Sequence, residues 1–141
     1  MKKNSLIIVA YIGLIFGVVV SCTNDTSNNE IDKAKKTLEI EAEIADKQLA
    51  GKKIDAISKC ISCNFDGENM VYTYEIDENS ISIDKLSEIK ETMEKNLKNH
   101  LSENAQFAIT KENLIKVGGT VIYNYVGSKS KKVMTITIVL Q

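Results

Sequence analysis

Two cysteines, Cys60 and Cys63, are the residues of this 141-residue chain whose spacing most readily suggests chemistry. A Cys-x-x-Cys pair can be redox-active when it opens a helix after a strand, because the helix N-terminus favours the thiolate. The two thiols could also form a structural disulfide in an oxidising compartment, or be buried as free thiols. In a regular strand over residues 58–65, side chains three positions apart point to opposite faces. We therefore expect a poor geometry for a Cys60–Cys63 disulfide, and all three alternatives stay open.

His100 is the only histidine, and it gives little support for a metal centre or a catalytic site. A structural zinc site needs about four ligands, whereas His100, Cys60 and Cys63 are the soft ligands to be considered. A nucleophilic site would need a base and an orienting acid that the sequence does not indicate. The Ser-x-x-Lys patterns at residues 82–85 and 128–131 lack the companion motifs of penicillin-binding enzymes. We predict no metal, no cofactor and no enzymatic activity.

Two tyrosine pairs are better candidates for a binding surface: Tyr72 with Tyr74, and Tyr123 with Tyr125. Within each pair the rings fall on one face of a strand. If the two strands are neighbours, the four rings form one patch. Such a patch would stabilise the sheet by about 0.2–1 kcal/mol per cross-strand pair, or it would present a recognition face, since tyrosine is enriched in interface hot spots. We therefore take these four residues as a possible binding face.

The N-terminus has the three regions of an export signal. Lys2 and Lys3 form a short basic start, residues 6–20 form an uncharged apolar run, and the small residue Ser21 follows. A helix needs about 20 apolar residues to cross a bilayer comfortably, and this run is shorter. The pattern therefore favours a cleaved signal over a permanent transmembrane anchor.

Residues 19–22, Val-Val-Ser-Cys, resemble the lipobox of bacterial lipoproteins, in which the cysteine thiol receives diacylglycerol. The resemblance implies cleavage before Cys22 and a membrane anchor made of acyl chains, such as palmitate, on that cysteine. We expect a signal peptide over residues 1–21, a flexible polar tether over 22–30 and one domain over 31–141. The anchor would lie in the outer membrane facing the periplasm of a Gram-negative cell, or on the outer face of a Gram-positive cytoplasmic membrane.

The charge balance argues against nucleic acid as a partner. The chain has no arginine, and loss of Lys2 and Lys3 with the signal would leave 16 lysines against 19 acidic residues, a net charge of −3. Affinity for nucleic acid depends on clustered lysine and arginine side chains that meet phosphates. We therefore expect a membrane and a protein as partners.

The elements that position these residues follow two periodicities. Apolar residues recur at three- and four-residue steps over residues 30–50 and 83–101, which predicts two helices, and a short turn or helix is expected near residues 110–119. Strand-forming stretches predict two hairpins, over residues 58–65 with 70–76 and over residues 120–126 with 133–140. The order helix, hairpin, helix, hairpin predicts an α+β fold: an antiparallel sheet of about four strands, with helices on one face and a partly open second face.

The same order of motifs resembles a widespread class of small exported bacterial proteins of unknown function. The shared pattern is Ile-Asp, Tyr-x-Tyr, a helix, Gly, and a second Tyr-x-Tyr, which this chain matches with Ile54-Asp55, Tyr72 to Tyr74, Gly119 and Tyr123 to Tyr125. The resemblance implies a fold and an envelope location, and it implies no activity.

The function that fits these residues best is a noncatalytic, membrane-anchored lipoprotein that binds another envelope protein. One alternative is an immunity or inhibitor protein against an antibacterial toxin. A second is a structural or assembly factor of the envelope that pairs through the first helix. A third is a small-ligand carrier, for which a cavity between helix and sheet would be the signature.

Overall fold

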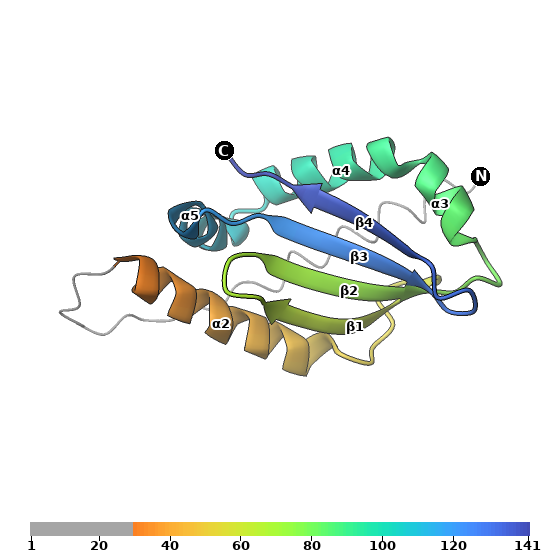
Figure 1. Cartoon of the computed structure of the whole chain (residues 1–141), viewed down its shortest axis with the longest axis horizontal. Helices are drawn as coiled ribbons and strands as arrows, with labels where there is room; N and C mark the ends of the chain where they lie inside the picture. The colour runs from red at the N-terminus through yellow and green to blue at the C-terminus, as the bar shows by residue number, and fades with distance from the viewer. Residues whose placement is uncertain (1–29) are drawn as a thin grey trace.

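A computed structural model describes residues 30–141 (Figure 1). The predicted signal peptide, Cys22 and all of the predicted tether except Glu30 lie outside the described residues. The elements follow in the order α2 (Glu30–Leu49), β1 (Ser58–Phe65), β2 (Met70–Ile76), α3 (Ile83–Glu88), α4 (Lys90–Glu103), α5 (Phe107–Val117), β3 (Val121–Gly127) and β4 (Val133–Ile138). The α+β class is therefore confirmed. Over residues 30–141, no helix is both long enough and apolar enough to cross a bilayer.

The strands form one sheet in the order β1-β2-β3-β4. The outer pairs are antiparallel, as expected, but β2 and β3 run parallel, so the prediction of a fully antiparallel sheet is wrong at its centre. The reason is the connection between them. Residues 77–120 hold three helices, and a crossover of that length returns the chain to the end of the sheet where β2 began.

The hydrophobic core lies on one face of this sheet. Its members alternate along the strands, as a half-buried sheet requires, and they pack against apolar residues from all four described helices. On the strand side the core consists of Cys60, Cys63, Met70, Tyr72, Tyr74, Ile76, Val121, Tyr123, Tyr125, Met134, Ile136 and Ile138. The opposite face of the sheet contributes no residue to the buried core, so the prediction of helices on one face is confirmed.

The second predicted helix is divided in two. Ser82 caps α3 by accepting a hydrogen bond of 3.2 Å from the backbone N–H of Lys85, and Asp84 lies in the first turn. Ile89 leaves helical geometry (φ −111°, ψ 18°), and α4 begins at the next residue. The break allows both short helices to bury apolar residues against the sheet.

Two glycines connect α5 to β3. Gly118 ends α5 in the left-handed conformation (φ 74°), which glycine adopts without strain. Gly119 lies so close to the turn between β1 and β2 that an added Cβ atom would overlap the carbonyl oxygen of Glu68. Asn69 in that turn accepts hydrogen bonds of 2.9 Å from both the backbone N–H and the hydroxyl of Thr120. The turn is therefore fastened to the start of β3.

Candidate binding site

The structure brings the four predicted tyrosines together. Tyr72 pairs with Tyr123 and Tyr74 with Tyr125 across the parallel strands β2 and β3. The ring centroids of these pairs are 5.3 Å and 5.5 Å apart, with interplanar angles of 21° and 34°. Spacings of this size allow favourable aromatic packing. The four rings thus form a continuous stack across the centre of the sheet.

The tyrosine stack lies on the core face of the sheet and not on a surface. The four side chains are 0–1 % exposed, so the expectation that they form a recognition face is corrected: in this structure they stabilise the interior. Burial raises the pKa of all four phenols, which keeps them protonated at physiological pH. The residue pattern could not reveal this, because alternation says that two faces differ but not which face the helices cover.

Several buried polar atoms accompany the stack at one end of the sheet. The hydroxyls of Tyr74 and Tyr125 and the Oγ of Ser58 have no hydrogen-bond partner among the described residues. The Oδ2 atom of Asp55 is also unpaired there, although its Oδ1 atom accepts from the backbone N–H groups of Ile57 and Ser58 at 2.8 and 2.9 Å. A buried polar atom without a partner costs roughly 1–3 kcal/mol. Left without a partner, each of these groups opposes folding.

The two cysteines lie on the same face of β1, which corrects the expected opposite placement. A β-bulge shifts the register between Cys60 and Ser62, so that Cys60 lies opposite Tyr74 and Cys63 opposite Tyr72. Ile61 is the extra residue, and its side chain is exposed. A bulge of this kind moves every later residue of the strand to the other face. Both thiols are consequently buried, with their Sγ atoms 3.8 Å apart.

Helix α2 holds the bulged strand in place. The carboxylate of Asp46 accepts a hydrogen bond of 2.9 Å from the backbone N–H of Cys63. The hydrogen bond between the thiols lowers the pKa of Cys60 and, together with burial, raises that of Cys63. Within residues 30–141, no group of three histidine, cysteine or acidic side chains could hold a metal ion. His100 lies in the last turn of α4, away from this pair in the fold.

The outer face of the sheet is not covered by the helices of residues 30–141. Its side chains form three rows that cross all four strands. From β1 to β4, the first row is Lys59, Glu75, Val126 and Val133, the second is Ser62, Thr73, Asn124 and Thr135, and the third is Asn64, Val71, Ile122 and Thr137. We call these twelve residues the outer face. All of them are half-buried or exposed.

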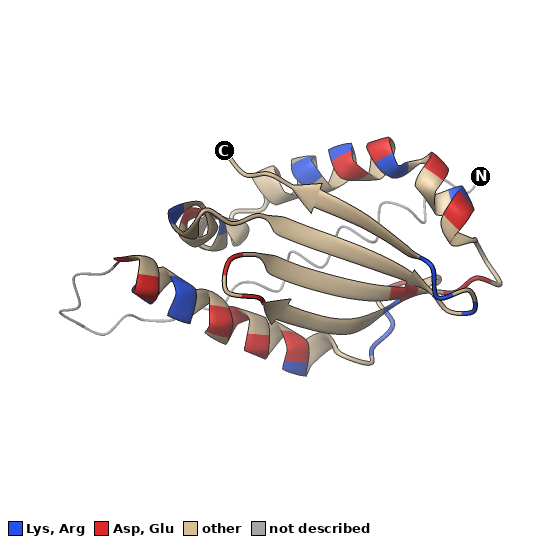
Figure 2. Cartoon of the chain, in the orientation of Figure 1, with Lys and Arg blue, Asp and Glu red and all other residues tan. Residues whose placement is uncertain are grey.

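The outer face has little charge. Its two charged residues, Lys59 and Glu75, form an ion pair with each other at 3.5 Å. Figure 2 shows that acidic and basic residues gather on the helices and in the loops, whereas the strands are almost free of them. The middle row is polar but neutral, and in it Thr135 donates a hydrogen bond of 2.7 Å to the amide oxygen of Asn124. Low charge with some aliphatic area is typical of the central part of protein–protein interfaces.

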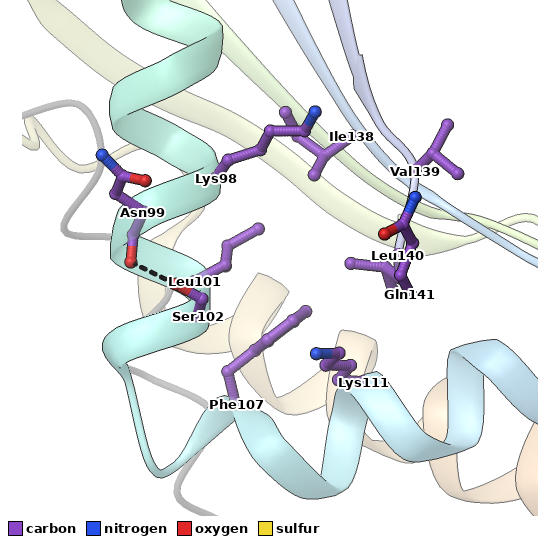
Figure 3. A pocket seen from close by; sticks show the side chains of 10 residues that line it. All are labelled: Lys98, Asn99, Leu101, Ser102, Phe107, Lys111, Ile138, Val139, Leu140 and Gln141. Atoms are coloured by element: carbon purple, nitrogen blue, oxygen red, sulfur yellow. Dashed lines mark hydrogen bonds between the residues drawn. The ribbon is translucent and has the colours of Figure 1, made fainter.

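A pocket of about 360 Å³ opens where α4, α5 and the end of β4 meet (Figure 3). Leu101, Phe107 and Ile138 form an apolar wall, and Lys98 and Lys111 stand at its sides. The residue pattern gave no indication of this pocket, because its lining comes from segments far apart in the chain. The pocket therefore combines a small apolar area with two positive charges.

No protein-family model matches the chain, and no curated protein matches it by sequence. Among solved structures, the chain is similar to a protein from Pseudomonas aeruginosa, described as a candidate secreted protein and determined by crystallography at 1.60 Å. The two structures share a TM-score of 0.64 at 11 % identity, over 79 % of this chain and 94 % of the other. At this identity the likeness shows the fold alone.

Proposed function

We propose that this protein is an exported, lipid-anchored envelope protein that binds another envelope protein through the outer face of its sheet and carries out no catalysis. The observation that carries the proposal is the outer face itself: three rows of mostly neutral side chains on a sheet whose other face is the one that the helices of residues 30–141 cover. The partner would present a surface of similarly low charge, since an unmatched charge buried on this face would cost binding free energy.

The export and anchoring parts of the proposal rest on the N-terminal residues. The basic start, the apolar run and the Val-Val-Ser-Cys segment that ends at Cys22 support cleavage and lipidation. The secreted description of the Pseudomonas protein with the same fold is consistent with an address outside the cytoplasm. Replacement of Cys22 by alanine should abolish labelling by radioactive palmitate and prevent cleavage before residue 22, so that the variant keeps the apolar run of residues 6–20. Palmitate labelling that persists without the cysteine, or a wild-type protein that carries no label, would count against the lipid anchor.

The binding surface can be tested in cells with the full chain. A photo-crosslinking amino acid is placed at Thr135 or Ile122 on the outer face, and at Lys36 on the exposed side of α2 as the matched control. We expect both outer-face positions to yield one crosslinked envelope protein and the Lys36 position to yield none. The same partner captured from Lys36 alone would favour an assembly factor that pairs through the first helix. Absence of any crosslinked protein from the outer face would contradict the proposal.

The pocket beside Phe107 supports a second candidate function, the carriage of a small amphipathic anion. Calorimetric titration of the protein with decanoate tests it, with decyltrimethylammonium as a probe of equal tail length and opposite charge. A carrier should bind decanoate, should not bind the cation, and should lose affinity when Lys98 and Lys111 are both replaced by alanine. Equal binding of both probes would show that the pocket binds apolar tails without selecting the charge of the head group.

A further inference from the structure

The bulge in β1 brings the side chains of Cys60 and Cys63 together on one face of the strand. The two Sγ atoms are 3.8 Å apart, and both side chains point to the core face. A disulfide requires a separation of about 2.05 Å, so the sulfurs must approach by roughly 1.8 Å. A regular strand would place the same two side chains on opposite faces. The extra residue Ile61 is thus the feature that makes the pair possible.

The surroundings of the pair determine when it could react. Cys60 and Cys63 are 0 % and 3 % exposed, because they lie between the sheet and α2, which packs against β1. Asp46 on α2 also binds the backbone N–H of Cys63. A soluble oxidant cannot reach buried sulfurs in the closed fold. The reaction would therefore take place while the chain folds, before α2 closes over β1.

We propose that Cys60 and Cys63 form an intramolecular disulfide in the exported protein, and that this disulfide locks the bulge of β1. This inference rests on the proposed export, since disulfides persist outside the cytoplasm. The oxidant is a disulfide-bonded thiol oxidase of the envelope. One cysteine thiolate attacks the disulfide of the oxidase, and the second displaces it. One sulfur–sulfur bond forms in the chain and one breaks in the oxidase, which leaves as a dithiol with both electrons and both protons.

The test uses the full chain, produced with its leader in bacteria that have an active envelope oxidase. Free thiols are alkylated under denaturing conditions before digestion with trypsin. Cleavage after Lys59 and Lys85 leaves Cys60 and Cys63 in one peptide that does not contain Cys22. We expect this peptide to be unalkylated and lighter than the dithiol form by two hydrogen atoms, and to take up alkyl groups only after reduction. Complete alkylation without reduction would overturn the inference for the exported protein.

A double variant provides the geometric control. Ser62→Cys with Cys63→Ser keeps two thiols but moves the second to the outer face, since Ser62 lies opposite Thr73 in the outer-face row. We expect the double variant to remain fully alkylated, provided that circular dichroism shows a folded protein. A disulfide formed as readily in this variant would show that the bulge does not control pairing.

A measurement on the reduced, purified full chain separates the geometry from export. The chain is equilibrated with reduced and oxidised glutathione, once in buffer that allows folding and once in denaturant. We expect the equilibrium constant for disulfide formation to be at least tenfold higher under folding conditions. A disulfide that forms in folding buffer but not in cells would support the pairing of Cys60 with Cys63 and count against export. An equal constant in both solvents would contradict the inference that the fold brings the thiols together.

Discussion

The hydroxyl of Thr110 on α5 donates a hydrogen bond of 2.8 Å to the carboxylate of Glu41 on α2, which joins two helices across 69 residues of sequence. Glu41 is 4 % exposed and lies within the apolar stripe of its helix. Burial raises the pKa of Glu41, and the hydrogen bond from Thr110 opposes the rise. The folded chain therefore contains a carboxyl group that is costly to ionise where it lies.

Glu41→Gln should stabilise the protein at neutral pH. A raised pKa means that the folded state holds the proton more tightly than the unfolded state, so the free energy of unfolding falls as the pH rises from the ordinary value of 4.5 through the raised value. Glutamine does not ionise, so the free energy of unfolding of the Glu41→Gln variant does not fall with pH for this reason. Urea unfolding from pH 4 to pH 8 should show an advantage that grows with pH. Glu39→Gln, an exposed change on the same helix, is the control and should show no such trend. A variant less stable than the wild type at pH 8 would mean that the carboxylate is needed in its charged form.

Tyr125→Phe should leave stability unchanged or raise it. The hydroxyl of Tyr125 is buried and has no hydrogen-bond partner among the described residues, so its removal relieves a desolvation cost and keeps the ring in the stack. Tyr125→Ala, which removes the ring, should cost about 3–5 kcal/mol. Chemical unfolding of both variants measures the difference. A loss of more than about 1 kcal/mol in the phenylalanine variant would show that the hydroxyl is bonded in solution, to water or to a ligand.

Gly119→Ala should destabilise the fold by about 1–3 kcal/mol, the usual cost of an added methyl group where no space exists. The new Cβ atom would overlap the backbone carbonyl of Glu68, which a side-chain rotation cannot move away. The neighbouring Gly118 offers a matched control, because an added Cβ atom meets no atom there. Gly118→Asn should cost less, since asparagine tolerates the left-handed conformation. Thermal unfolding midpoints in the reverse order would contradict the close packing of the β1–β2 turn on Gly119.

Glu78 should keep the β3–β4 turn in place even at strongly acidic pH. Its carboxylate accepts hydrogen bonds from the backbone N–H groups of Ser130 (2.6 Å) and Lys129 (2.7 Å), and the bond from Ser130 is the main cause that lowers the pKa of Glu78 to about 2. A lowered pKa means that this contribution to stability is present above the ordinary value of 4.5 and is lost as the pH falls through about 2. NMR titration of the Lys129 and Ser130 amide signals should give a midpoint near 2.

Glu78→Gln tests the same contact at neutral pH. The amide cannot supply a charged acceptor, so the Lys129 and Ser130 amide protons should exchange faster with solvent than in the wild type. Glu88→Gln, an exposed change in α3, should leave their exchange unaltered. Unchanged exchange in the Glu78 variant would mean that the turn is held by its own backbone hydrogen bonds.

Local residue patterns determined the elements of this protein. The three- and four-residue spacing of Ala34, Leu38, Ala42 and Ala45 predicts α2, and all four residues are buried on one side of that helix. The alternation of Met134, Ile136 and Ile138 predicts β4, and these three residues face the core. Patterns of this kind depend on contacts within one element and on the contrast between its two faces, so the sequence is sufficient for them.

Tertiary structure alone decided how the elements combine. The parallel pairing of Tyr72 with Tyr123 joins segments separated by three helices, and no local pattern encodes the direction in which β3 returns. Whether the four tyrosine side chains are buried depends on which face of the sheet the helices cover. The approach of Cys60 to Cys63 depends on the single extra residue Ile61, because one residue of register exchanges the two faces of a strand. Each of these features is a long-range packing choice, and together they bury the tyrosine stack and leave the outer-face residues half-buried or exposed.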